Sequence, residues 1–163
     1  MEIWDAFDIH GNKLNIDLVR DQPIPEGLYH IVSEILVKHQ DGSYLLMQRD
    51  QSKRAYPTRY EATAGGSAIK GETPKQAAIR ELFEETGVRC ETLDLLYKLL
   101  TKDSIYFCYL GITDMDKTKI VLQQGETMGY RWVSQDEFVN FVQSDDCIVE
   151  QQERLRRYLK EYL

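Results

Sequence analysis

The sequence predicts one domain of the α/β (α+β) class, with helices packed on a central mixed sheet. The chain of 163 residues is long enough for one domain with a buried core and too short for two of ordinary size. Strand and helix signals follow one another without the strict alternation of a βαβ fold. No repeat, and no linker rich in Pro, Gly and Ser, divides the chain. Residues 1–163 are therefore expected to form a single domain.

Strand signals dominate the first half of the chain. β-Forming residues gather in the segments 2–9, 30–39 and 43–50. Asp41-Gly42, between the last two segments, is a two-residue turn signal and predicts a β-hairpin. Two prolines exclude regular structure from 21–27, and residues 53–66 are expected to form a loop that leads into a short strand.

The second half contains more strands and ends in helices. Four further strands are expected, at 92–100, 104–112, 119–122 and 129–133. Ser134 and Glu137 stand in capping-box spacing and begin a helix over about 134–142. An apolar stripe predicts a last helix over 149–162.

The best specified helix lies between these two groups of strands. Thr73 and Gln76 form a capping box, and Pro74 occupies the first helical position, where proline is favoured. Gly87 suits the left-handed position that ends a helix. The sequence therefore predicts a helix over 74–86, roughly 20 Å long.

Three glutamates, Glu81, Glu84 and Glu85, share one face of this helix. Their mutual repulsion weakens the helix unless a cation compensates it, and Mg²⁺ suits carboxylate oxygens together with phosphate. The glycine-rich loop 65–71 lets backbone approach a ligand closely, because glycine has no Cβ. Taken alone, however, RELFEE is more often a solvated helix face on which Arg80 pairs locally.

A longer pattern favours the metal site. Seven residues follow the spacing glycine, five residues, glutamate, seven residues, then Arg-Glu-U-x-Glu-Glu-x-Gly-U with U aliphatic: Gly66, Glu72, Arg80, Glu81, Glu84, Glu85 and Gly87. Leu82 and Val88 fill the aliphatic positions. The probability that these seven residues occur at this spacing by chance is on the order of one in ten million, or less, for each starting position. Residues 66–88 therefore match the Nudix box, and the chain resembles the Nudix hydrolase superfamily.

The resemblance extends beyond the box. The segments EIWDAFDIHGNKL, PEGLYH, LLMQRD and YPTRYEATAGGSAIKGE look like the branch of Nudix proteins related to isopentenyl-diphosphate isomerase, and GYRWVSQDEF matches it more weakly. The resemblance implies a Nudix-type α/β/α sandwich and a requirement for Mg²⁺ or Mn²⁺. It also implies hydrolysis of a small-molecule substrate, a nucleoside diphosphate linked to another moiety.

The match assigns roles to residues of the box. The metal ligands implied by it are Glu81, Glu84 and Glu85. Glu84 and Glu85 are also candidates for catalysis, with Glu84 either a ligand or a base. Arg80 would orient the carboxylates by ion pairing, and Gly66 and Glu72 would shape the turn from loop to helix.

Two further glutamates are candidates for the site. Glu126 precedes a Trp-Val strand, where Nudix enzymes often place a catalytic or metal-binding glutamate, and an exposed loop residue is the alternative. Glu61, just ahead of the box, would accept hydrogen bonds from substrate or help to hold metal. Gly65 and Gly66 would bring backbone to the substrate.

A local basic cluster suits phosphates. Arg49 and Arg59 are the stronger candidates for contacting substrate, while Lys53 and Arg54 are more typical of solvated loop charges. Four aromatic residues are candidates for stacking a base, namely Tyr56, Tyr60, Tyr106 and Trp132, although aromatic residues in strands more often belong to a core.

Two other functions compete with hydrolysis. An isomerase would need its catalytic cysteine at Gly65 and a histidine ligand at Ser67, and glycine supplies no acid for protonation at carbon. His30 aligns with another isomerase histidine, but a histidine at a strand start is more often structural. A non-catalytic domain that senses a nucleotide is the third candidate, and the intact box favours hydrolysis over it.

Composition restricts the cell compartment and the partners. A formal net charge of −7 argues against binding of polymeric nucleic acid. The three cysteines form no CxxC pair, which favours a reducing, cytoplasmic setting. No signal peptide or apolar membrane span is apparent. The sequence leaves open which diphosphate is cleaved, how many metals bind and whether the chain forms a homodimer.

Overall fold

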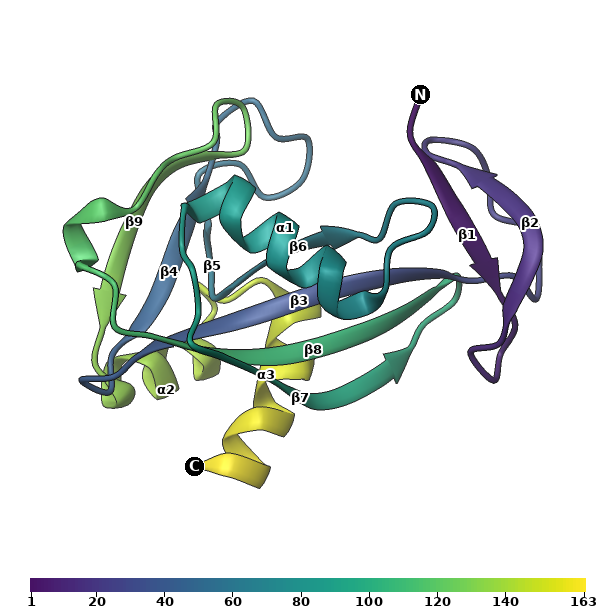
Figure 1. The fold of residues 1–163 in the computed structure, drawn as a ribbon. Coiled ribbons are helices and arrows are strands. Elements are labelled where there is room, and N and C mark those ends of the chain that lie inside the picture. The colour runs from purple at the N-terminus through teal and green to yellow at the C-terminus, as the bar shows by residue number, and fades with distance from the viewer.

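The computed structural model describes all 163 residues (Figure 1). The strands are β1 (Ile3–Phe7), β2 (Lys13–Val19), β3 (His30–His39), β4 (Tyr44–Arg49), β5 (Tyr60–Glu61), β6 (Thr63–Ser67), β7 (Thr92–Leu100), β8 (Ser104–Thr113) and β9 (Thr127–Val133). The helices are α1 (Pro74–Thr86), α2 (Gln135–Gln143) and α3 (Val149–Tyr162). None of them is long and apolar enough to cross a membrane.

The central sheet is mixed and branches at β3. Strand β3 runs parallel to β8 along its whole length and antiparallel to β6, while β8 pairs with β7. The expected β3–β4 hairpin has a single paired position, Lys38 with Tyr44, because β4 turns away to pair with β5 and β9. Strand β6 pairs only with β3, so its other edge has no partner strand just before α1 begins.

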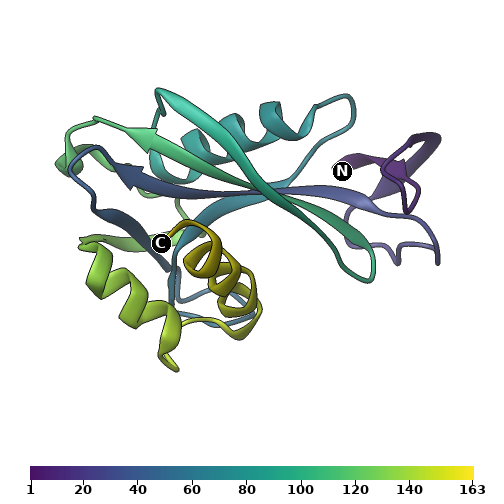
Figure 2. The same ribbon diagram turned by 90° about the horizontal axis from the view of Figure 1, so that it is seen from below.

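Helices cover both faces of this sheet (Figure 2). Side chains of β3 alternate between the two faces, as a strand requires. Ile35 packs in one apolar cluster with Leu82 of α1, and Leu36 packs in another with Phe138 of α2 and Tyr158 of α3. The mixed α+β fold predicted from the sequence is confirmed, with α1 in one layer and α2 and α3 in the other.

Helix α1 begins and ends where its sequence predicts. The Gln76 N–H donates to Thr73 Oγ1 (3.2 Å), and the Thr73 N–H donates to the Gln76 side chain (2.8 Å). Gly87 ends the helix with φ +71°. The buried face consists of Ala77, Ala78, Leu82 and Thr86. Those positions face the sheet; of the three glutamates of the box, Glu81 and Glu85 lie beside this face, against β6, and Glu84 is exposed.

The strand expected at 119–122 is wrong. A short 3-10 helix covers Lys117–Lys119 instead, and the Asp116 side chain accepts from the Thr118 N–H to begin it. Ile120 is partly buried against the α1-side cluster, whereas Val121 and Leu122 are exposed and have no partner strand. An apolar run forms a strand only where a neighbouring strand is free to pair with it.

The N-terminal hairpin, β1 with β2, forms a separate two-stranded sheet, and its second strand was not expected from the sequence. The hairpin is fixed to the loop that precedes α1. The Lys70 N–H donates to the carbonyl of Ile3, and the Gly71 N–H donates to the Asp5 carboxylate, both at 2.8 Å. Trp4 stacks on His30, with ring centroids 4.2 Å apart.

Candidate active site

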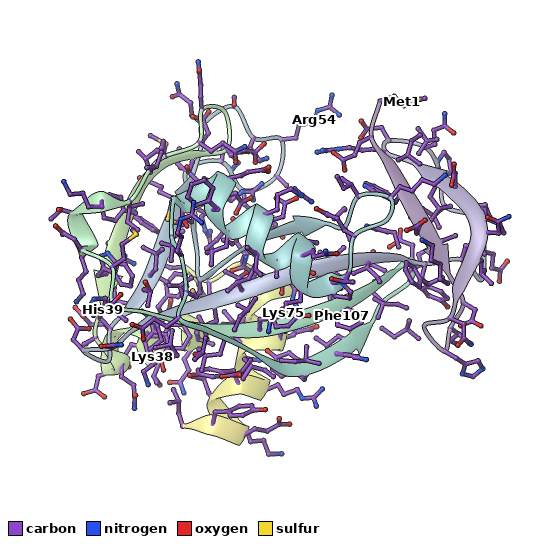
Figure 3. All side chains as sticks on the ribbon, viewed as in Figure 1. Met1, Lys38, His39, Arg54, Lys75 and Phe107 are labelled. Carbon is purple, nitrogen blue, oxygen red and sulfur yellow. The ribbon has the colours of Figure 1, made fainter.

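A cavity of about 630 Å³ lies beside the acidic face of α1. Its walls come from the N-terminal hairpin, the glycines of β6, the loop after β4 and the loop before β9. Figure 3 shows Met1 of the hairpin and Arg54 of the loop after β4 at the same end of the molecule. The cavity thus gathers segments that are far apart in the sequence.

The structure brings nine of the ten predicted site residues to this cavity. They are Arg49, Glu61, Gly65, Gly66, Arg80, Glu81, Glu84, Glu85 and Glu126. Lys53, which the sequence analysis favoured as a solvated loop charge, also lines it.

Arg59 is the exception. Its Nη2 donates to the main-chain carbonyl of Asp145 in the turn between α2 and α3, and the side chain lines a separate cavity of about 280 Å³. Tyr56 and Thr58, with φ of +50° and +64°, turn the chain just before it. The expected contact between Arg59 and a substrate at the acidic face therefore has no support in the structure.

Arg80 is the centre of an ion-pair network on α1. Its Nε and Nη2 donate to the two carboxylate oxygens of Glu72 at 2.7 and 2.9 Å. Its Nη1 donates to Glu81 (2.7 Å) and, at 3.3 Å, to Glu84. The Nη2 group also donates to the carbonyl of Ser67 (3.1 Å). Arg80 therefore ties Glu81 and Glu84 of the helix to the loop, and its hydrogen bonds to Glu72 lower the pKa of that carboxyl group.

The two glycines of β6 are required by close approach. A Cβ on Gly66 would lie 2.7 Å from the carboxyl carbon of Glu81. A Cβ on Gly65 would lie 2.0 Å from the carbonyl oxygen of Ser33, and its φ of +154° is one that other residues rarely adopt. The Gly65 N–H donates to Glu85 Oε2 at 3.1 Å. Bare backbone thus lies directly against Glu81 and Glu85.

Two carboxylates outside the box face the same cavity. Glu61 of β5 pairs with Arg49, and Glu126 pairs with Lys53. Burial raises the pKa of Glu61, although the charge of Arg49 opposes this. Arg49, at the end of β4, and Lys53, in the loop after it, are thus both already paired with a carboxylate.

The lining carries more negative than positive charge. Eight carboxyl groups and four cationic side chains line the cavity, which leaves a formal excess of four negative charges when all of them are ionised. Burial is the main cause that raises the pKa of Glu85 to about 8, and the charges of Glu81, Glu61 and Glu126 add to it. Burial likewise raises the pKa of Glu81.

The donor chemistry fits a hard divalent cation, but the side chains do not converge. All candidate donors are carboxylate oxygens, the ligands that Mg²⁺ prefers. No group of three or more His, Cys, Asp or Glu residues is arranged so that it could hold a metal ion. The cause is visible in the contacts, because Glu81 and Glu84 turn to Arg80 while Glu85 turns to Gly65. A metal ion held by all three glutamates would therefore require Glu81 and Glu84 to turn towards Glu85.

The raised pKa of Glu85 predicts a pH-dependent stability in metal-free protein. Between its ordinary value of 4.5 and about 8, an unfolded Glu85 has lost its proton while the folded one keeps it. The free energy of unfolding should therefore fall as pH rises through this window, by on the order of a few kcal/mol. Glu85→Gln should show a smaller fall, because only Glu61 and Glu81 then contribute to it, and should be more stable than the wild type at pH 8. Denaturant unfolding of both proteins with a chelator, at pH 5 and pH 8, checks this; an equal pH dependence would contradict it.

Several cavity residues were not predicted from the sequence. The N-terminal hairpin contributes Glu2, Trp4, Arg20 and Asp21, and the sheet and α3 contribute Glu34 and Gln151. The only available signal was Glu34, a charged residue within the apolar run HIVSEILV. The others carry no local mark, because their place depends on how distant segments pack.

The chain is similar to known proteins both in sequence and in fold. The NUDIX domain family model matches residues 28–152. An uncharacterised Nudix hydrolase of Listeria monocytogenes is 30% identical over 143 residues, which is 84% of this chain and 82% of that protein. A crystal structure from Deinococcus radiodurans has a TM-score of 0.75 at 19% identity, covering 96% of this chain and 98% of the other. The Nudix domain of NrtR from Shewanella oneidensis, solved with ADP-ribose, has a TM-score of 0.60 at 17% identity, covering 80% and 88%.

Proposed function

Since the chain belongs to the Nudix family of hydrolases, we propose that it cleaves, with Mg²⁺ or Mn²⁺, the diphosphate linkage of a nucleoside diphosphate joined to another moiety. The observation that carries this proposal is the excess negative charge of the cavity beside Glu81, Glu84 and Glu85. A diphosphate is itself an anion, so it would be repelled from such a lining unless cations bind with it. A divalent ion supplies that countercharge, polarises the phosphoryl oxygens and lowers the pKa of a bound water.

The residues of α1 would hold the ion. Glu81 and Glu85 are the principal ligands in this proposal, with Glu84 a third ligand or a base. Arg80 keeps its bidentate pair with Glu72 and so fixes the helix against the loop while Glu81 and Glu84 rotate. Glu126 lines the same cavity from the loop before β9 and is the further candidate for accepting a proton.

The end of β4 and the loop after it would contact the phosphates that the metal leaves free. Arg49 uses Nε for the carbonyl of Ala55 and Nη1 for Glu61, so its Nη2 donors remain available. Lys53 would exchange its contact with Glu126 for a phosphate oxygen, which would release Glu126 for catalysis. The bare backbone of Gly65 and Gly66 allows the substrate to approach the strand closely.

A substrate panel tests the proposal. The protein is incubated with Mg²⁺ or Mn²⁺ and ADP-ribose, diadenosine polyphosphates, nucleoside triphosphates, coenzyme A or isopentenyl diphosphate, and products are identified by mass. We expect metal-dependent cleavage of at least one nucleotide between two phosphorus atoms. Tight binding of a nucleotide without cleavage would contradict the proposal and favour a sensor. Rearrangement of isopentenyl diphosphate would contradict it in favour of an isomerase.

The site offers little for the isomerase alternative. Gly65 and Ser67 lie on β6 at the cavity wall, and neither can supply the acid that protonation at carbon needs. His30 is buried against Trp4, and its Nδ1 lies 3.2 Å from the carbonyl of Asp103. These contacts support a structural role for His30.

A further inference from the structure

Arg59 is the one predicted site residue that does not line the cavity beside α1, and it lines a second cavity instead. This second cavity has a volume of about 280 Å³ and lies between the start of β5, strand β9 and the end of α2. It shares no lining residue with the cavity beside α1, and it is called the arginine cavity below. Its lining residues are Thr58, Arg59, Tyr60, Arg131, Phe141 and Asp146.

Two arginines line the arginine cavity without a carboxylate partner. Elsewhere in the protein, Arg49, Arg80 and Arg154 each bind a glutamate, whereas Arg59 and Arg131 form no salt bridge. The chain contains 27 acidic and 20 basic residues, so carboxylates are in excess. Two guanidinium groups at one cavity also repel each other unless a negative charge lies between them. The arginine cavity therefore lacks a countercharge that the rest of the fold supplies to its buried arginines.

The contacts of these two arginines leave most of their N–H donors unused. Arg59 Nη2 donates to the main-chain carbonyl of Asp145. The guanidinium carbon of Arg131 lies 4.3 Å from the centre of the Tyr60 ring, and none of its N–H groups donates to an oxygen of the protein. A guanidinium carries five N–H donors. Nη1 of Arg59 and the whole guanidinium of Arg131 are therefore available to a ligand.

The position of Arg59 is costly for the fold. Its Nε is closed off from water and has no hydrogen-bond partner, although buried donors are normally paired. Tyr56 and Thr58 have left-handed φ values of +50° and +64°, and such a value is an outlier for a β-branched residue such as Thr58. Backbone strain of this kind concentrates at active sites and ligand-binding segments. The contact with Asp145 accounts for one donor of Arg59, but it does not account for these costs.

We propose that the arginine cavity is a second binding site, which takes a phosphate group between Arg59 and Arg131. A phosphate carries up to two negative charges, and the donor forks of arginine match its oxygens. The cavity is slightly smaller than the range of about 300–1,000 Å³ that is typical of small-molecule sites, which suits free phosphate or a small phosphate monoester. The rings of Tyr60 and Phe141 would contact the organic part of a monoester. This inference does not rest on the proposed hydrolysis.

Asp146 allows a test with two opposite expected results. It is the one carboxylate that lines the arginine cavity, it is exposed, and it forms no salt bridge. Because its charge repels phosphate, Asp146→Asn should bind phosphate severalfold more tightly. Arg131→Gln removes a guanidinium and should bind phosphate about tenfold more weakly.

Each of these two variants has a control with the same change in net charge. Arg54→Gln matches Arg131→Gln, because Arg54 is an exposed arginine that lines neither cavity. Glu153→Gln matches Asp146→Asn, because Glu153 is an exposed glutamate on α3 that also lines neither cavity. Both controls should bind phosphate as the wild type does.

Binding is measured by NMR on the full-length protein, with a chelator present so that no metal ion draws phosphate to the acidic face of α1. Inorganic phosphate and ribose 5-phosphate are titrated separately, and sodium chloride is the control for ionic strength. The signals followed are the backbone amides of Arg59, Arg131 and Asp146 and the side-chain Nε–H of Arg59. This Nε proton should be visible because it is shielded from water.

We expect phosphate, but not chloride, to shift these signals to saturation, with the affinities of the variants in the order given above. Tighter binding of ribose 5-phosphate than of phosphate would assign the site to a phosphorylated small molecule, and weaker binding would assign it to free phosphate. Shifts that do not saturate, or equal affinities of Arg131→Gln and Arg54→Gln, would overturn the inference. Shifts confined to Gly65 and Gly66 would place phosphate only in the cavity beside α1 and would overturn it as well.

Discussion

Glu85→Gln is expected to lower metal-dependent turnover by at least about a thousandfold. The amide keeps the size of the side chain, and its oxygen can still accept from the Gly65 N–H, so the loop should stay in place. What is lost is the negative charge of the most buried carboxylate of the box and its place in the metal shell. Steady-state kinetics on the substrate found in the panel, at saturating Mg²⁺, measure the effect.

The control for this variant is Glu153→Gln, an exposed glutamate on α3 outside the cavity. It carries the same chemical change and should leave kcat and KM as in the wild type. If Glu85→Gln retains its turnover, Glu85 is not a ligand of the essential metal. If both variants lose activity together, the loss is a general effect of charge and the assignment to Glu85 is equally wrong.

Gly66→Ala is expected to leave the protein folded and to weaken metal binding by one to two orders of magnitude, roughly the effect of disturbing the support of a metal ligand. The added Cβ would lie 2.7 Å from the Glu81 carboxyl group, which is the far end of a flexible side chain and can move aside. The Cβ then takes up space that the Glu81 carboxyl group would need when it turns towards Glu85 and the metal. Titration with Mn²⁺, followed by electron paramagnetic resonance, measures the affinity, and thermal unfolding measures the stability.

Gly42→Ala is the control, because its Cβ would meet no atom within 4 Å. Its φ of +93° makes the substitution slightly destabilising, but Gly42 lies at the β3–β4 turn, outside the cavity. It should bind Mn²⁺ as the wild type does. Wild-type Mn²⁺ affinity in Gly66→Ala would show that Glu81 does not need the space beside β6, and Glu81 would lose its role as a ligand.

The parts of the fold that depend on neighbouring residues could be predicted from the sequence. Thr73, Gln76 and Gly87 define α1 within one segment, and the spacing of Glu81, Glu84 and Glu85 places them together along its side. Pairings between distant strands could not be predicted in this way. The turn at Asp41-Gly42 was visible, but the competition of β9 for β4 was not, so the extent of the β3–β4 hairpin was overestimated.

The same distinction between local spacing and distant packing applies to the residues of the site. The box predicted the acidic face because its spacing is local. Arg59 and Lys53 carry equal charges in one short segment, yet the turn at Thr58 sends Arg59 to α2 and α3 while Lys53 meets Glu126. Gln151 reaches the cavity only because α3 packs on the far face of the sheet. Such placements depend on tertiary packing, which residue spacing does not encode.

The most direct test of the central claim is to follow the substrate's cleavage in heavy-oxygen water, with Mg²⁺ present, and to weigh both products. Attack of water on phosphorus places one heavy oxygen in a newly formed phosphate group, and the account predicts this label in the wild type and no product in Glu85→Gln. A product without the label, or a labelled product formed equally well by Glu85→Gln, would contradict hydrolysis at the carboxylates of α1.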